Sequence, residues 1–365
     1  MSDGAHAVRV LGWAMLDRLR AQDESSRGIC ISPLSIATTL AMLAGAVSVD
    51  RRDEFCRKLG ANSLSELADS FRTLDDVFAG KDHGRMVTMA NVAFADDDVE
   101  FRPAYTQFLD SFGAYSIKFP SLQQADGEIN SWVSDHTRGL IKDLVSRQVL
   151  KESHVVLINA LAFKGSWQTK FNRKLTQKNT PFHAAGLEKR KVDMMFSHKR
   201  SIATAKGPCY TVVRLPYAAT SPLTSMSLAA YLPDQGTSLE QLIQTMNHSQ
   251  PASRFRTKKY DKFGFPKFDL DSNFSILHIL QDLGFPVAGQ LPEMAQGGNE
   301  VQKCIHRAVL KIDEEGTEAA AATAIILTRS LAPIPEILVF DRPFAFSICL
   351  DQTDMVVFTG LFFGR

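Results

Sequence analysis

The residues that could take part in chemistry lie between Asp313 and Leu331, where Arg329 and Ser330 follow a run of small and β-branched residues. One interpretation is an alanine-rich helix with Thr317 as its N-cap, because alanine has the highest helix propensity. The other is a strand, since residues 325–328 have strand character and no helical stripe. Its alternate positions are all small, so one face could enter a packed β-sheet without clashes: Thr317, Ala319, Ala321 and Thr323.

Nucleophiles, acids and bases elsewhere in the chain do not form the sets that enzymes use. The sequence has no G-x-S-x-G elbow, no H-E-x-x-H zinc motif and no phosphate-binding loop. No two of the five cysteines have C-x-x-C spacing, which argues against a metal site. We therefore expect a protein that is not an enzyme and that carries neither metal nor cofactor.

Composition is that of a large globular protein. The 365 residues are 45% hydrophobic and 22% charged, with a net charge of +1, which gives no reason to expect nucleic acid or an acidic membrane as partner. No apolar run reaches the roughly 18 residues that a membrane span needs. The first residues lack a basic start and an apolar stretch, and the cysteines are odd in number and scattered. We therefore expect a cytoplasmic protein with reduced thiols.

Periodicity and turn residues predict one interwoven α+β domain without repeats or linkers. Helices are expected at residues 5–21, 34–44, 50–79, 105–112, 128–139 and 273–283. Strands are expected at residues 29–31, 87–95, 155–163, 212–217, 225–232, 262–270, 305–312, 337–340, 344–350 and 355–363.

Two polar residues fall inside segments that should be buried. Ser35 lies in a helix that is apolar nearly all round, begins with Pro33 and is capped by Ser32. Asn159 lies in the middle of a continuous apolar strand. Each must find a hydrogen-bond partner inside the protein.

Several motifs together resemble those of the serpin family, in the family's order along the chain. The most specific are Asn-Ala-Leu-Ala-Phe-Lys-Gly-Ser-Trp at residues 159–167 and Phe-Asp-Arg-Pro-Phe at 340–344, followed by Phe-Thr-Gly at 358–360. Shorter matches are Ile-Ser-Pro-Leu-Ser at 31–35, Leu-Pro at 232–233, Pro-Lys-Phe at 266–268 and His-Arg-Ala-Val-Leu at 306–310. The resemblance runs from about Trp13 to the end of the chain.

The resemblance implies a single serpin domain over residues 1–365, with three β-sheets and eight or nine helices. Residues 314–335 would contain the hinge and the exposed reactive-centre loop. The hinge would comprise Glu315, Gly316, Thr317, Glu318, Ala319, Ala320, Ala321, Ala322 and Thr323. Four residues resemble the family's polar cluster beneath the sheet that opens, although ordinary core hydrogen bonding would also explain them: Ser32, Ser35, Asn159 and His306.

The function that the resemblance implies is inhibition of a serine protease by a suicide-substrate trap. Cleavage after Arg329 would give the loop a free end that inserts into the main sheet, and arginine suits the acidic pocket of trypsin-like proteases. The family's usual count from Gly316 instead places the bond at Ser330–Leu331. The alternative function is that of a non-inhibitory serpin acting as carrier or chaperone.

The remaining expectations concern partners and location. The resemblance implies a monomer that leaves the cell, if at all, without a signal peptide. Basic groups at residues 189–191, 199–200 and 254–262 suit weak glycosaminoglycan binding, although a solvated face is the more ordinary explanation.

Overall fold

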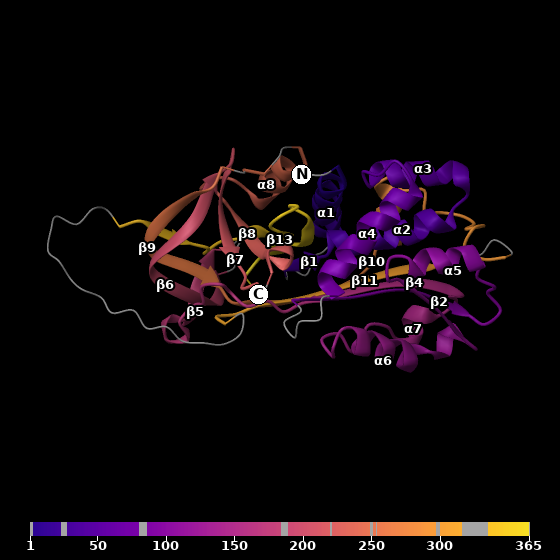
Figure 1. Cartoon of the computed structure of the whole chain (residues 1–365). Coiled ribbons are helices and arrows are strands. Elements are labelled where there is room, and N and C mark those ends of the chain that lie inside the picture. Colours follow the sequence, from indigo (N-terminus) through magenta and orange to yellow (C-terminus); the bar gives the residue numbers. More distant parts are fainter. Residues whose placement is uncertain are drawn as a thin grey trace.

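The computed structural model describes residues 3–22, 28–79, 86–183, 189–219, 221–248, 251–252, 254–296, 300–315 and 335–364 (Figure 1). The described helices are α1 Asp3–Gln22, α2 Pro33–Ala46, α3 Val49–Lys58, α4 Leu64–Ala79, α5 Pro103–Asp110, α6 Asp126–His136, α7 Arg147–Leu150, α8 Leu239–His248 and α9 Leu277–Asp282. The described strands are β1 Ile29–Ile31, β2 Val87–Asp96, β3 Tyr115–Phe119, β4 Val155–Phe163, β5 Gln177–His183, β6 Lys189–Lys206, β7 Tyr210–Pro216, β8 Met226–Pro233, β9 Arg256–Pro266, β10 Phe268–Ser275, β11 Lys303–Ile312, β12 Ile337–Val339, β13 Phe344–Leu350 and β14 Val356–Phe362. The predicted α+β class is confirmed.

The strands of the described residues form two hydrogen-bonded sheets. One has five strands in the order β10-β11-β4-β2-β3. The other has nine, in the order β1-β14-β13-β8-β7-β6-β9-β12, with β5 paired to β6. Three sheets were expected, and two of them are joined here into the nine-stranded sheet. The link is β6, which is 18 residues long and pairs with β5 near its start and with β7 near its end.

The five-stranded sheet divides the core into two layers. Figure 1 shows α6 and α7 on one face and α2 and α4 on the other. The larger hydrophobic cluster includes residues of α2 and of the nine-stranded sheet. The smaller cluster lies on the opposite face of the five-stranded sheet, where α6 and the residues after it pack against β2 and β4. We call the α2 side the back and the α6 side the front. All nine residues of β4 are buried, as its continuous apolar run predicts.

The prediction of a helix at residues 273–283 is wrong at its start. Residues up to Ser275 belong to β10, and the helix α9 begins only at Leu277. β10 alternates buried and exposed residues and pairs with β11 over eight positions, and this ladder outweighs the local helical pattern. The predicted strand 262–270 is likewise two strands, β9 and β10, which meet at Lys267.

A substitution at Gly360 can test how closely β14 packs against its neighbouring strands β1 and β13. A Cβ at this position would overlap the carbonyl oxygen of Ile29 on β1 and the ring of Phe346 on β13. We expect Gly360→Ala to lower the free energy of unfolding by about 1–3 kcal/mol, the usual cost of overpacking. Gly127→Ala is the control, because an added Cβ there meets nothing within 4 Å. Urea unfolding curves that leave the two variants equally stable would contradict this view of β14.

Candidate functional site

The centre of the five-stranded sheet is a parallel pair, β4 beside β11. Eight residue pairs match in register, from Val156 with Lys303 to Phe163 with Leu310. On their outer sides both strands have antiparallel neighbours, β2 next to β4 and β10 next to β11. We call the line between β4 and β11 the seam.

The direction of the seam strands determines what could enter between them. The chain leaves β11 at Ile312, so a segment that turns back along the sheet runs antiparallel to β11. Because β4 is parallel to β11, the same segment is antiparallel to β4 as well. One parallel ladder would then be replaced by two antiparallel ladders, which are slightly more stable per residue.

A row of polar side chains crosses the back of the sheet under α2. In the register, His306 on β11 faces Asn159 on β4, which faces Asn91 on β2. The His306 Nδ1 atom lies 2.5 Å from Asn159 Oδ1, and His306 Nε2 accepts a hydrogen bond from the Ser32 backbone N–H at 3.1 Å. The Asn159 amide donates to the Ser35 carbonyl oxygen at 2.7 Å and to the Asn91 side-chain oxygen.

These contacts require a single protonation state of His306. Nε2 accepts from a backbone N–H, so the ring proton must lie on Nδ1 and point to Asn159. Burial lowers the pKa of His306 to about 3, so the ring is neutral at physiological pH. The row therefore joins β4, β11 and α2 without burying a charge.

The structure brings together the four residues predicted from sequence as a cluster. Ser32 caps α2, its side chain accepting from the Ser35 N–H at 3.1 Å, and supplies the backbone N–H that His306 binds. Ser35 takes part through its carbonyl, since its hydroxyl oxygen has no hydrogen-bond partner within the described part of the chain. Asn91 was missed, although it had the same signal as Asn159: a polar residue inside an apolar strand.

A second polar group closes the end of the seam where β4 and β11 both finish. Glu314 is buried, accepts a hydrogen bond from Thr176 Oγ1 at 2.7 Å and pairs with Lys267 at 3.0 Å. The Trp167 indole donates to the Asp313 carbonyl oxygen at 2.8 Å. Sequence analysis missed Lys267 and Thr176, although Lys267 and Trp167 stand within the motifs that carry the family resemblance.

Electrostatics hold Glu314 ionised in this position. Burial alone would raise its pKa, but the hydrogen bond from Thr176, its own backbone N–H and the Lys267 ammonium together hold the pKa below its ordinary value. The next residue, Glu315, forms an ion pair with Arg173. Glu315 is the one predicted hinge residue that the structure describes; Gly316 to Thr323, Arg329 and Ser330 lie outside the described residues.

The described residues contain no group of three or more His, Cys, Asp or Glu side chains arranged to hold a metal ion. Among the described helices, none combines the length and the apolar character that crossing a bilayer requires.

His306 gives the native state a specific dependence on pH. Its ordinary pKa is 6.5 and its folded pKa is about 3, so between these values the unfolded chain binds the proton and the folded chain does not. Stability from this residue is complete above pH 6.5 and falls as the pH drops toward 3. We expect a loss of about 2 kcal/mol between pH 7 and pH 5 that is absent in His306→Gln. Urea unfolding at both pH values measures it, and identical pH dependence in the two proteins would contradict it.

Comparison with known proteins agrees with this geometry. A family model described as "Serpin (serine protease inhibitor)" matches residues 6–364. Serpin-ZXA of Oryza sativa subsp. japonica is 30% identical over 360 residues, covering 92% of this chain and 90% of that protein. Serpin B6 of Pongo abelii is 25% identical over 357 residues, covering 93% and 94%. The structure of Arabidopsis AtSerpin1 in its native stressed conformation matches with a TM-score of 0.86 at 25% identity, over 99% of this chain and 98% of that one. The chain therefore belongs to the serpin family, whose members are in general serine protease inhibitors that act as suicide substrates.

Proposed function

We propose that this chain inhibits trypsin-like serine proteases as a single-use trap and has no catalytic residues of its own. The protease serine attacks the carbonyl carbon of Arg329 and forms an ester with it. The bond to the Ser330 nitrogen breaks, and that nitrogen leaves as a protonated amine. The freed arm, beginning at Gly316, enters the seam as a new strand. The attached protease is then dragged across the molecule and distorted before water can hydrolyse the ester.

The observation that supports this proposal is a closed seam, together with a sequence after β11 that could form an additional strand. β4 and β11 pair directly, and the segment after β11 has small side chains at alternate positions. Each added ladder hydrogen bond is worth about 1 kcal/mol net. A strand of a dozen residues therefore supplies on the order of 10 kcal/mol, before apolar burial is added.

Two neighbouring bonds compete as the site of attack. Arg329–Ser330 offers an arginine, which the acidic pocket of a trypsin-like protease binds as a buried ion pair. Ser330–Leu331 agrees better with the family's usual count from Gly316, but a serine side chain offers a protease pocket little to hold. We therefore favour Arg329.

The alternative function is that of a non-inhibitory serpin, a carrier or chaperone. Members of that kind tend to carry proline, charge or bulk in the inserting arm, whereas residues 319–323 are four alanines and a threonine. A complex with trypsin that survives SDS would exclude this alternative, because only an acyl-enzyme bond resists the detergent.

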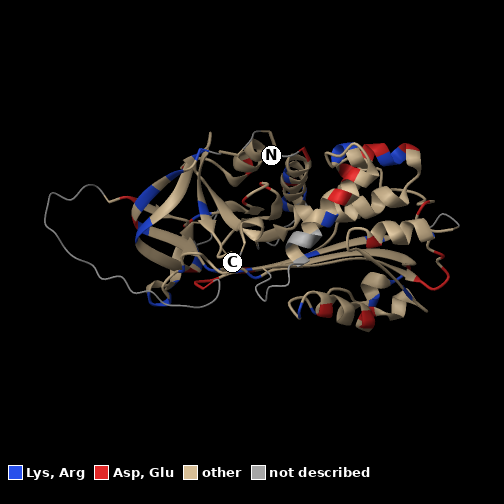
Figure 2. Cartoon of the chain, viewed as in Figure 1, with Lys and Arg blue, Asp and Glu red and all other residues tan. Residues whose placement is uncertain are grey.

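Weak glycosaminoglycan binding is a further part of the proposal. Figure 2 shows Lys and Arg along the neighbouring strands β6 and β9. In the register of these strands, Lys259 of β9 pairs with Ser201 of β6, and Lys262 pairs with His198. One member of the predicted basic groups does not belong to this surface. Arg200 is 9% exposed, and its guanidinium lies 4.4 Å from the centre of the Phe171 ring.

We also propose a reducing, cytoplasmic location and a monomeric state. All five cysteines are free thiols, and Cys30, Cys56 and Cys304 are buried. Burial raises the pKa of Cys304 to about 12, so this thiol is unreactive.

Arg329→Ala tests the assigned bond. The variant should keep its fold and lose roughly 100-fold or more in its rate of trypsin inhibition, because truncating one partner of a buried charge pair costs about 3 kcal/mol. Arg329→Lys should retain most of the activity, since it keeps the positive charge. Mass spectrometry of the wild-type reaction in denaturant should find a C-terminal fragment beginning at Ser330. A fragment beginning at Leu331 would place the bond one residue later.

The hinge is tested by changes that leave Arg329 in place. Ala321→Pro removes a ladder donor, and Thr317→Arg places a charge on the face that enters the sheet. Both variants should be cleaved at the normal rate but release active trypsin, because insertion becomes slower than deacylation. Ala321→Ser keeps the N–H and the small size, so it should still trap. Gels that separate covalent complex from cleaved inhibitor decide the matter, and wild-type amounts of complex in all three would rule out insertion of this arm.

A further inference from the structure

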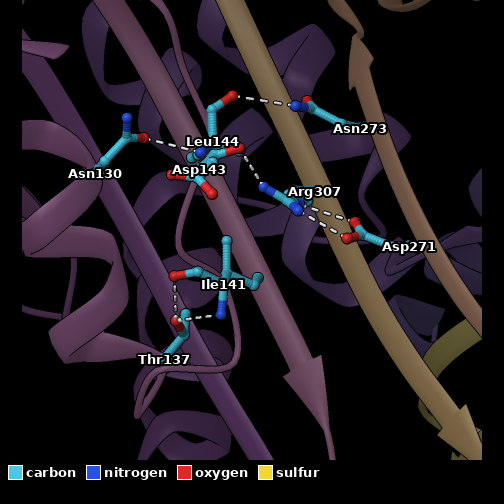
Figure 3. Close-up of polar contacts among 8 residues, drawn as sticks. All are labelled: Asn130, Thr137, Ile141, Asp143, Leu144, Asp271, Asn273 and Arg307. Atoms are coloured by element: carbon cyan, nitrogen blue, oxygen red, sulfur yellow. Dashed lines mark hydrogen bonds and ion pairs between the residues drawn. The ribbon is translucent and has the colours of Figure 1, made fainter. Parts of the chain in front are cut away.

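The segment between α6 and α7 crosses the front of the sheet over the seam. This crossing segment, residues 137–146, buries Ile141, Leu144 and Val145 in the same apolar cluster as Ile158 of β4 and Ile305 of β11. Figure 3 shows it between Asn130 on one side and Arg307 and Asn273 on the other. It therefore bridges the two halves of the sheet that would have to separate.

On the side of β2 and β3, the crossing segment is bound to α6. The Asn130 side-chain oxygen accepts from the backbone N–H groups of Leu144, at 2.8 Å, and Val145, at 3.0 Å. Its amide nitrogen donates to the Val145 carbonyl oxygen at 2.8 Å. α6 itself is held to this half of the sheet by Trp132, whose ring lies 5.6 Å from Phe94 of β2 and 5.4 Å from Tyr115 of β3.

On the other side, two side chains bind backbone carbonyl groups of the crossing segment. Arg307 of β11 donates from Nη1 to Asp143, and Asn273 of β10 donates from Nδ2 to Leu144 at 3.1 Å. Arg307 also binds Asp271 of β10 through both carboxylate oxygens, at 2.8 and 2.7 Å. The Arg307–Asp271 pair joins β10 to β11 and does not cross the seam.

We propose that Arg307 and Asn273 form a clasp whose release sets the rate at which the seam opens, while Asn130 keeps the crossing segment on the α6 side. This inference rests on the proposed function, because it concerns the opening that the trap requires. A segment bound to both halves must leave one when they separate. Leaving α6 would break three hydrogen bonds to Asn130, whereas leaving β10 and β11 breaks two.

Release on the β10–β11 side also leaves no charge unpaired. Arg307 keeps both bonds to Asp271 after it loses the Asp143 carbonyl, and the Asp271 side chain is 49% exposed. Asp143 and Asn273 are exposed residues, so water can bind the Asp143 carbonyl oxygen and the Asn273 amide after release, and only the carbonyl oxygen of the buried Leu144 loses its partner. On the α6 side, the Leu144 and Val145 N–H groups belong to buried residues and would lose their partner.

The test measures how fast the intact protein takes up a synthetic peptide with the sequence of residues 317–328, followed on native gels. Asn273→Ala and Arg307→Met should each accelerate uptake about fivefold, the factor for one hydrogen bond worth about 1 kcal/mol. Asp271→Asn is the control, because Asp271 lies on the same strand and face as Asn273. It weakens the ion pair with Arg307 but leaves the bonds of Arg307 and Asn273 to the crossing segment. Its uptake rate should change less than twofold.

The outcomes separate the clasp from the trap. If the wild type takes up no peptide, the sheet does not open, and the proposed function fails together with the clasp. If the wild type takes up peptide and Asn273→Ala and Arg307→Met do so at its rate, the clasp alone is wrong. Hydrogen exchange of the peptide-loaded wild type should find the Leu144 and Val145 amides still protected, and loss of that protection would mean that the segment leaves α6 instead.

Discussion

The parallel pairing of β4 with β11 is the constraint on which the rest of this structure depends. The chain that follows β11 can reach this seam only by turning back, and it then meets both strands in the antiparallel sense. On the proposed mechanism, the native sheet lacks its most favourable central strand, and the sequence that could supply it is covalently attached to the end of β11. The same mechanism requires the surrounding elements to keep the seam closed until that segment has a free end.

The two faces of the seam are held in chemically different ways. At the back, the side chains of His306, Asn159 and Asn91 form a buried, uncharged row of hydrogen bonds in which each donor has a defined acceptor. The backbone N–H of Ser32 at the start of α2 donates to His306 and so joins the row to the helix. At the front, the crossing segment rests on apolar side chains and is attached at its far edge by Arg307 and Asn273, close to solvent. A buried row of this kind favours one register of β4 against β11, whereas contacts near solvent can be exchanged for water at small cost. On the proposed mechanism, this division keeps the native sheet in one register and still allows β4 and β11 to separate.

Sequence analysis found the back of the site and missed the front for a physical reason. Asn159 and His306 are polar residues within apolar runs, and a buried polar group must have a hydrogen-bond partner inside the protein. Asn130 and Asn273 stand among polar residues in the sequence, and a charged residue such as Arg307 within a strand is ordinarily assigned to its exposed face. The partners of all three are mostly backbone atoms, which the pattern of side chains does not identify. Strand β6 was missed for a related reason, since its many charged residues conceal the alternation that usually marks a strand. Residues 273–275 were misassigned because pairing with a distant strand outweighs a local helical pattern.

The position of the last three strands determines what happens to the protein when a peptide bond within residues 316–334 is cleaved. β13 and β14 lie in the interior of the nine-stranded sheet, between β8 and β1, and β12 is paired with β9. A chain severed before β12 would consist of two polypeptides that share one sheet and one core, with the short C-terminal piece held by two complete ladders. Because β1 comes from the N-terminal part of the chain, each piece supplies strands that the other needs. The protein would behave after cleavage as a tightly bound heterodimer, and the smaller piece would separate only when the whole sheet unfolds.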